Sequence, residues 1–248
     1  MENKIHLRET TTTAATASRT PRTGASVGPS SSSPSRAPSM LPQWALDIVR
    51  AAVHALSRVV WKIRFAGVGH VPEAARGGLI IAANHQTYID PFWISLQVKR
   101  PIRYLAWNEA FKWPVIGRLL ELLGSWPLQL EGSDPAAIRR SLLWLRQGGA
   151  VVIFPEGGRA EADGALMKFK AGAARMALEA GVPILPVTIR GGHRVWPKGW
   201  RIPRAGRVEI IYHPLYTVEP HEGEDTRACA RRATDDLKNI IGTALDKG

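Results

Sequence analysis

The sequence predicts an α/β sandwich in which helices flank a mostly parallel central sheet, preceded by an amphipathic helix that associates with a membrane. Two observations lead to this fold class. Short apolar runs of the kind that form buried strands alternate with segments that carry helical periodicity or helix-start signals, and such alternation is typical of parallel sheets covered by helices. The chain also shows no internal repeat, and no uncharged apolar run long enough to span a bilayer.

The first 40 residues differ in composition from the rest of the chain. They are rich in Ser, Thr, Pro and Ala and contain almost no large apolar side chains, so residues 1–40 are expected to be a disordered tail. Their Arg and Ser content also resembles an organelle transit peptide, and the sequence leaves that alternative open.

Residues 41–66 are expected to form an amphipathic helix at a membrane interface. Apolar residues recur every three or four positions from Ala45 to Ile63, and a basic stripe runs beside them, with Trp44 and Trp61 near the two ends. The basic stripe consists of Arg50, His54, Arg58 and Lys62. A helix packed on the core with its basic face in water is the alternative. The two arrangements are compatible if part of the apolar stripe packs on the core and the rest contacts lipid.

Residues 67–248 are expected to form one α/β domain. Aliphatic and β-branched runs predict its strands, and the Asp-Pro pairs at residues 90–91 and 134–135 place a capping residue before Pro at the first helical position. The predicted strands span residues 79–83, 102–106, 151–154, 184–189 and 208–212. The predicted helices span residues 91–98, 113–123, 135–147, 170–180 and 226–245.

The composition is basic and apolar at once. The chain has 33 Lys and Arg against 21 Asp and Glu, a formal charge of +12, with 45% hydrophobic residues and 9 Trp. Anionic lipid head groups and phosphorylated acyl carriers suit this balance. Nucleic acid would suit the charge too, but the chain has no zinc-ligand spacing, aromatic RNA-binding motif or basic recognition helix. We therefore predict no nucleic-acid partner, and a monotopic protein on the cytoplasmic face of the cell membrane.

His85 and Asp90 are the most informative pair of residues. They follow the predicted strand at residues 79–83, and Asp90 stands at the start of the next helix. A histidine can take a hydroxyl proton near neutral pH, and a carboxylate on its other ring nitrogen fixes the tautomer and stabilises the imidazolium. The pair therefore predicts a general-base site. The alternative is a capping aspartate beside an unrelated histidine at the rim of the sheet.

A second block, residues 151–159, ends a β-branched run in a Gly-rich turn that carries Glu156 and Arg159. The planar guanidinium of Arg suits phosphate, and the carboxylate of Glu can accept from substrate hydroxyls or hold the Arg in place. The block predicts a site for a polar head group, with a surface ion pair as the alternative.

With these two blocks in this order, the chain resembles the glycerolipid acyltransferase family of the lysophosphatidate acyltransferase type, which carries a His-x4-Asp block and a Phe-Pro-Glu-Gly-x-Arg block. The similarity continues in residues 106–124, 169–173 and 182–187, so that it covers residues 68–215. The residues that support the motifs are Asn84, Thr87, Pro155 and Pro186.

The resemblance implies an O-acyltransferase of the 1-acylglycerol-3-phosphate type that acts in phospholipid biosynthesis. It implies that His85 deprotonates the acceptor hydroxyl, that Asp90 orients His85, and that the hydroxyl attacks a fatty acyl thioester. Acyl-CoA or acyl carrier protein would be the donor and a lysophospholipid the acceptor, at a membrane lipid surface and without a metal or redox cofactor. The residues assigned to the acceptor and its phosphate are Glu156, Gly157, Arg159 and Lys170.

The sequence departs from the family pattern at Leu130, which stands where an Arg contacts the phosphate, and at Trp107 and Asn108, which replace basic residues. One charge-assisted contact of that kind is worth on the order of 1.5 to 3 kcal/mol, enough to change the preferred acceptor. Lysophosphatidate, another lysolipid and a hydroxylated amino-lipid therefore stay open. The residues that could supply the missing charge are Arg159, Lys168, Lys170 and Arg139.

Two other functions stay open on the residues alone. A thioester or lipid hydrolase could use His85 and Asp90 to activate water, and a non-catalytic lipid-binding module could retain the fold after the acceptor site had decayed at Leu130. Residues 113–126 are expected to line an acyl-chain groove or to dip into the membrane, with a plain core helix as the alternative. Residues 191–201 interleave cations with aromatic residues, which suits either interfacial anchoring or a hairpin loop.

Overall fold

The computed structural model describes residues 41–73, 77–129 and 134–246; the tail expected at residues 1–40 and the departure at Leu130 lie outside these described residues. The first elements are α1 (Gln43–Val60), β1 (Arg64–Ala66), the 3-10 helix η1 (Val68–His70), β2 (Leu79–Ala83), α2 (Asp90–Ser95), β3 (Ile102–Trp107), the 3-10 helix η3 (Asn108–Lys112) and α3 (Pro114–Leu122). They are followed by β4 (Ser125–Leu128), α4 (Pro135–Arg146), β5 (Ala150–Ile153), α5 (Gly172–Ala180), β6 (Ile184–Arg190), α6 (Gly192–Val195), β7 (Glu209–Tyr212) and α7 (Thr226–Asp246).

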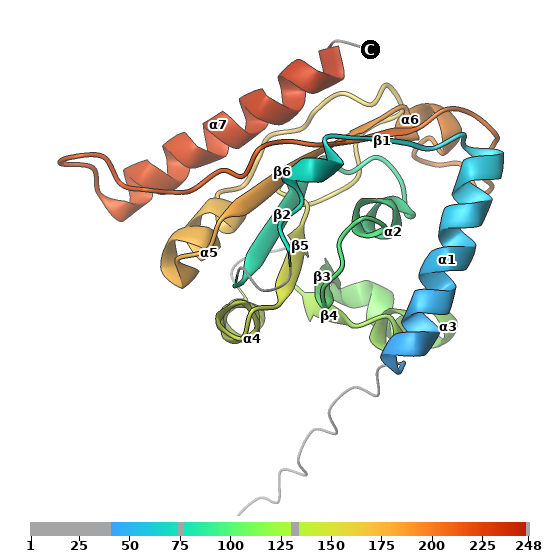
Figure 1. The fold of residues 1–248 in the computed structure, drawn as a ribbon, viewed down its shortest axis with the longest axis horizontal. Helices are drawn as coiled ribbons and strands as arrows, with labels where there is room; N and C mark the ends of the chain where they lie inside the picture. Colours follow the sequence, from blue (N-terminus) through green and yellow to red (C-terminus); the bar gives the residue numbers. More distant parts are fainter. Residues whose placement is uncertain (1–40, 74–76, 130–133, 247–248) are drawn as a thin grey trace, which may run out of the picture. The chain divides into compact units, whose positions relative to one another are not determined.

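The strands form a 7-stranded sheet in the order β1-β7-β6-β2-β5-β3-β4 (Figure 1). Neighbouring strands run parallel, except that β6 and β7 are antiparallel. Each predicted strand and helix of the α/β domain is present with small differences at its ends. The predicted α/β sandwich with a mostly parallel central sheet is therefore confirmed.

The central strand β2 supplies two cores, one on each face of the sheet. Leu79 and Ile81 pack with Trp93 and Ile94 of α2, whereas Ile80 packs with side chains of α4, α5 and α7. Figure 1 shows these three helices on one side of the sheet and α1 and α2 on the other. Each residue of β2 is buried, as expected for a parallel strand that is covered on both faces.

The two outermost strands, β1 and β4, are not predicted by the sequence. β1 falls within the segment expected to be helical, and that expectation is wrong after Val60. The chain leaves the helical conformation at Lys62, whose φ is 41°, and residues 64–66 pair with β7. β4 contains Pro127, which has no N–H to donate, and a strand tolerates this at the edge of a sheet.

Helix α1 docks so that an apolar stripe stays outside. Its buried Ser57 accepts a hydrogen bond from Trp93 Nε1 at 3.0 Å. Two members of the predicted basic stripe turn toward the domain: the Arg50 side chain is 24% exposed, and His54 meets Phe65 edge-on. The exposed stripe contains Trp44 (67%), Ile48 (61%), Leu56 (54%) and Val59 (78%). No helix in the described part of the chain is both long and apolar enough to cross a membrane.

Candidate active site

The carboxyl ends of β2, β5 and β6 meet at one edge of the sheet, the edge at which open α/β sheets bind ligands. The loops that follow β2 and β5 are joined there by two hydrogen bonds of the His85 main chain. His85 N donates to Glu156 Oε1 at 2.7 Å, and Ala160 N donates to His85 O at 2.7 Å. The two sequence blocks, 71 residues apart, therefore form one structural unit.

His85 and Asp90 come together as the sequence predicts. His85 Nδ1 lies 2.9 Å from Asp90 Oδ2, and Phe154 stacks on the imidazole with the ring centroids 4.0 Å apart. Asp90 is fully buried. With Nδ1 donating to this carboxylate, the imidazole presents Nε2 as the nitrogen that can take a proton from a bound hydroxyl. The His85 side chain is 18% exposed, so its ring lies at the surface of the unit.

Further hydrogen bonds hold Asp90 in position. The main-chain N–H groups of Gln86 and Thr87 both donate to Oδ2, and the Thr87 hydroxyl donates to Oδ1 at 2.6 Å. Asn84 fixes the start of the same loop, because its side-chain amide donates to Ile189 O at 2.9 Å and accepts from Ile189 N at 2.7 Å. Asn84 and Thr87 are thus buried residues that hold the loop in place through hydrogen bonds to β6 and to Asp90.

The two motif-supporting prolines lie in the backbone around the site. Pro155 O accepts from Lys170 N at 2.8 Å, which closes the turn after β5. Pro186 lies in β6 opposite Ala82 of β2, and its carbonyl accepts from His213 N at 3.0 Å. Both prolines are buried, so their contribution is to the course of the chain.

Gly157, Arg159 and Lys170 gather at the turn after β5. Gly157 has a φ of +71°, which favours glycine, and Lys170 Nζ lies 2.8 Å from where a Cβ on Gly157 would stand. The Arg159 guanidinium lies over the ring of Tyr88, with Cζ 3.7 Å from the ring centroid. Arg139 is exposed on α4, on the face of the sheet opposite α2. Arg159 and Lys170, two of the four cations considered from the sequence, therefore lie at this turn, and Lys168 is exposed two residues before Lys170.

Glu156 is buried and binds main-chain amides, whereas the sequence predicted that it binds the acceptor. It is 3% exposed, and its two carboxylate oxygens accept from His85 N at 2.7 Å and from Met167 N at 2.8 Å. Burial raises the pKa of the Glu156 carboxyl, and the two amide donors offset part of that rise. The sequence could not show this role, because both partners of the side chain are main-chain atoms.

Glu156→Gln is expected to lower the free energy of unfolding by about 1 to 3 kcal/mol, because the new amide nitrogen cannot accept and leaves one buried main-chain N–H unpaired. Urea denaturation followed by circular dichroism measures this change. Glu161→Gln on the same loop is the matched control, since Glu161 is exposed and its ion pair with Lys198 contributes little. Equal stability of the two variants would contradict the assigned contacts.

The stability difference between wild type and Glu156→Gln should depend on pH, and the raised pKa of Glu156 fixes the sign of that dependence. Because the folded-state pKa of Glu156 is raised above its ordinary value of 4.5, the folded protein binds this proton more readily than the unfolded chain. The stability difference between wild type and Glu156→Gln should therefore be largest below that ordinary value, and it should fall as the pH rises through the raised pKa. A difference that grows with pH over this interval would be inconsistent with burial as the dominant cause.

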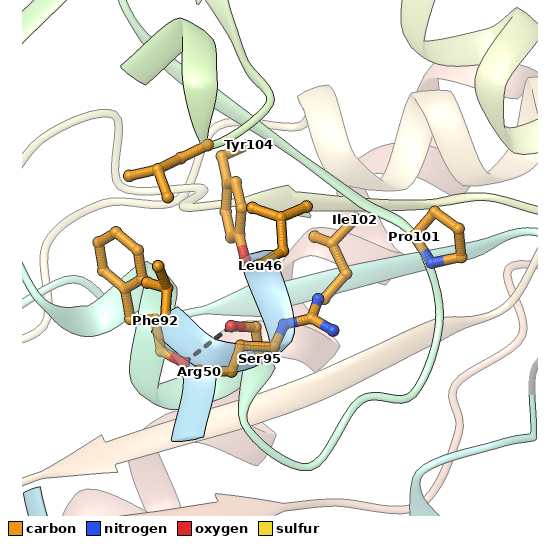
Figure 2. A pocket seen from close by; sticks show the side chains of 9 residues that line it. Leu46, Arg50, Phe92, Ser95, Pro101, Ile102 and Tyr104 are labelled. Carbon is orange, nitrogen blue, oxygen red and sulfur yellow. Dashed lines mark hydrogen bonds between the residues drawn. The ribbon is translucent and has the colours of Figure 1, made fainter. Parts of the chain in front are cut away.

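A small cavity of about 40 Å³ lies between α1, α2 and β3 (Figure 2). Arg50 reaches into it beside Ser95 and Tyr104, and Ser95 Oγ donates to Phe92 O at 2.8 Å. Burial raises the pKa of the Tyr104 hydroxyl. The cavity has room for a few water molecules, far less than an acyl chain fills. Across the described residues, no three His, Cys, Asp or Glu side chains are grouped as a metal site requires.

A comparison with protein families finds that a model described as "Acyltransferase" matches residues 62–190. The 1-acyl-sn-glycerol-3-phosphate acyltransferase LPAT1, chloroplastic, of Arabidopsis thaliana is 30% identical over 158 residues, which cover 62% of this chain and 43% of that protein. A 1-acyl-sn-glycerol-3-phosphate acyltransferase of Pseudomonas aeruginosa is 31% identical over 182 residues, covering 71% of this chain and 66% of that protein. The chain spans about half the length of the plant relatives that it matches, 43% and 46%.

Among solved structures, the crystal structure of the 1-acyl-sn-glycerophosphate (LPA) acyltransferase PlsC from Thermotoga maritima is similar, with a TM-score of 0.63. The alignment covers 81% of this chain and 80% of that chain at 23% sequence identity. At this level of identity the similarity shows that the fold is shared.

Proposed function

Because the chain belongs to the acyltransferase family, we propose that it transfers a fatty acyl group from acyl-CoA or acyl carrier protein to the hydroxyl of a lysophospholipid of the 1-acyl-glycerol-3-phosphate type, in phospholipid biosynthesis. The observation that carries the proposal is the 2.9 Å contact between His85 Nδ1 and the buried carboxylate of Asp90. It lies on the same structural unit as Arg159 and Lys170. A base and phosphate-binding cations held together are what direct transfer to a phosphorylated alcohol requires.

In the proposed reaction, His85 Nε2 takes the proton of the acceptor hydroxyl while the hydroxyl oxygen attacks the carbonyl carbon of the thioester. The tetrahedral intermediate then expels the thiolate, which recovers the proton from His85, so the products are a diacyl lipid and a free thiol. Asp90 stabilises the imidazolium between these two proton transfers. Arg159 and Lys170 hold the phosphate. The reaction needs no enzyme nucleophile, and Cys229 is buried in α7.

Lipid mass spectrometry tests the proposal directly. The purified protein is incubated with a mixture of lysolipids and either acyl-CoA or acyl carrier protein loaded with the same chain. We expect a diacyl product from a phosphate-bearing lysolipid and little product from a neutral one. Thioester cleavage at the same rate with and without lysolipid would indicate a hydrolase. Binding to anionic vesicles without any product would indicate a lipid-binding module.

We also propose that the protein reaches its lipid substrates through an apolar surface on α1 and α3. α3 is no plain core helix, since Trp113 at its start, Val115 and Leu119 are 53%, 78% and 48% exposed. The chain segment before α1 contacts the end of α3, because Leu41 N donates to Leu122 O at 3.2 Å. The interfacial surface, as we call it, comprises Trp44, Ile48, Leu56 and Val59 of α1 together with Trp113, Val115 and Leu119.

Several features support membrane contact by the interfacial surface. Its aromatic and aliphatic side chains lie on helices, and exposed cations stand among them at Arg58, Lys62, Lys112 and Arg118. Apolar side chains beside cations are the arrangement with which interfacial helices bind anionic head groups. We propose that the interfacial surface binds the cytoplasmic face of the cell membrane.

Replacing Ile48 and Val59 together by Asp is expected to lower partitioning onto phosphatidylglycerol vesicles by at least about 10-fold, since each side chain contributes on the order of 1.5 kcal/mol or more when it leaves water. Vesicle flotation measures the bound fraction. Leu143→Asp is the matched control, because Leu143 is 51% exposed on α4, away from the interfacial surface. If the double variant binds vesicles as the control does, α1 is not the contact.

A further inference from the structure

A stack of two aromatic rings and one guanidinium joins three segments beside the candidate base. Arg159 lies over the face of Tyr88, with Cζ 3.7 Å from the ring centroid. Trp196 meets the same ring edge-on, with the centroids 5.4 Å apart and the planes at 71°. Tyr88 lies in the loop that carries His85, Arg159 in the turn after β5, and Trp196 just after α6. Residues 191–201 were expected to act as an interfacial anchor or to form a hairpin loop; they contain α6, and Trp196 directly after it contacts Tyr88.

Among the residues that the structure describes, no acid forms an ion pair with Arg159, and its guanidinium instead lies over an aromatic ring. Its Nη1 atom is buried and makes no hydrogen bond to any residue that the structure describes. An aromatic face attracts a guanidinium through its negative quadrupole, so Tyr88 occupies the place that a carboxylate partner would otherwise take. A carboxylate would compete with a phosphate for the Arg. The ring holds the cation and leaves its charge available to a ligand.

The loop that presents the ring is itself fixed. Tyr88 lies between Thr87 and Asp90, whose side chains are hydrogen-bonded to each other at 2.6 Å, and Trp196 is held by its Nε1, which donates to Trp200 O at 3.0 Å. The position of the Arg159 cation is therefore coupled to the same loop that orients His85. In a 1-acyl-glycerol-3-phosphate, the free hydroxyl and the phosphate stand on neighbouring carbon atoms, so the spacing between base and cation decides which acceptors fit.

We propose that Tyr88 is the positioning residue of the acceptor site: its ring sets the Arg159 guanidinium at a fixed place relative to His85 and thereby selects acceptors whose phosphate neighbours the reacting hydroxyl. This inference rests on the proposed acyl transfer. Tyr88 is also 59% exposed, so its effect on the acceptor must be separated from any effect on membrane binding.

Steady-state kinetics in mixed micelles test the role through a split between KM and kcat. Tyr88→Leu removes the ring face and is expected to raise the KM for lysophosphatidate about 10-fold, within the 2- to 30-fold span of such contacts, while kcat and the KM for acyl-CoA stay within about 2-fold of wild type. Tyr88→Phe keeps the ring and should restore the wild-type KM. An unchanged KM in Tyr88→Leu, or a Phe variant as impaired as the Leu variant, would overturn the proposal.

The matched control is Trp200→Leu. Trp200 is another half-exposed aromatic residue with an arginine over its ring, since Arg204 Cζ lies 4.4 Å from the ring centroid. We expect this variant to leave the KM for lysophosphatidate unchanged. Vesicle flotation of Tyr88→Leu should equal wild type. A loss of vesicle binding, together with a KM that rises equally for every acceptor, would make Tyr88 an anchor and refute a positioning role.

A double-mutant cycle identifies Arg159 as the group through which Tyr88 acts. In an Arg159→Ala background, Tyr88→Leu should raise the KM for lysophosphatidate no further, because the cation that the ring positions is gone. Additive effects of the two substitutions would mean that Tyr88 acts independently of Arg159, contrary to the proposal.

If the protein forms no diacyl product, the proposed function is refuted, but the contact between Tyr88 and Arg159 can still be tested by spectroscopy. With ¹⁵N-labelled arginine, the side-chain signal assigned to Arg159 should carry a ring-current shift in wild type and in Tyr88→Phe. The shift should disappear in Tyr88→Leu. A signal that stays at the same position in Tyr88→Leu would show that the ring does not hold the guanidinium.

Discussion

His85→Ala is expected to lower turnover by at least about 10²-fold, because a positioned general base contributes about 10²- to 10⁴-fold to a proton-transfer step. The substitution removes the imidazole whose Nδ1 lies 2.9 Å from Asp90 and whose ring stacks on Phe154. Diacyl product formed from lysophosphatidate and acyl-CoA at saturating concentrations of both substrates measures the loss.

The folded state should survive this change. Asp90 keeps two main-chain donors on the same oxygen, from Gln86 and Thr87, so no buried charge is left without a partner. Vesicle binding is expected to remain close to that of wild type, since the interfacial surface is untouched. His221→Ala, which truncates an exposed imidazole before α7, is the matched control. Turnover of His85→Ala equal to that of the control would remove His85 from the role of base.

Asp90→Asn is expected to reduce turnover by up to about 10⁴-fold, the size of the loss when the carboxylate behind a catalytic histidine is replaced by its amide. The Asn carbonyl can take the place of Oδ2 and accept from His85, Gln86 and Thr87, and its amide can face the Thr87 hydroxyl. The fold is therefore retained, while the negative charge that stabilises the imidazolium is lost. The same product assay, with circular dichroism as a check on folding, measures the effect.

Asp90 is expected to act through His85. Comparing the loss of turnover in the two single variants with that in the double variant tests this. In a His85→Ala background, Asp90→Asn should cause little further loss, because residues that work as one unit are not additive. A further loss of the full size would show that Asp90 affects turnover by another route. Asp90→Ala, in contrast, should also destabilise the fold, because it leaves buried main-chain N–H groups of Gln86 and Thr87 unpaired, at about 1 to 3 kcal/mol each.

Features that depend on short stretches of chain were predictable. The buried runs that became β2, β5 and β6 carry their apolar pattern locally, and the approach of His85 to Asp90 follows from one strand-turn-helix junction of a few residues. Asp134 likewise caps α4, since its side chain accepts from Ala137 N at 2.9 Å, as the Asp-Pro signal indicates. Such local signals suffice because the interacting groups are close in sequence.

The orientation of α1 shows where this reasoning stops. Periodicity gives two stripes on a helix, but it does not say which stripe meets the protein. The predicted basic stripe is divided in the structure: Arg50 and His54 turn inward, whereas Arg58 and Lys62 stay exposed. The choice depends on Ser57 and its contact with Trp93, 36 residues away, and a helical pattern contains no information about that partner.

By itself, the sequence determined the α/β class, the main strands and helices, and the pairing of a histidine with an aspartate at a strand end, because apolar periodicity and short-range geometry are written into neighbouring residues. Only the tertiary structure decided that Glu156 accepts a hydrogen bond from the main chain of His85, that the Tyr88 ring packs against the guanidinium of Arg159, and that the outer face of α1 is apolar. Each of these rests on a contact between segments far apart in the chain, and the partner is a main-chain amide for Glu156, a ring face for Arg159 and an indole N–H for Ser57 of α1. Amides occur at nearly every residue, so only the folded chain shows which one a given side chain meets.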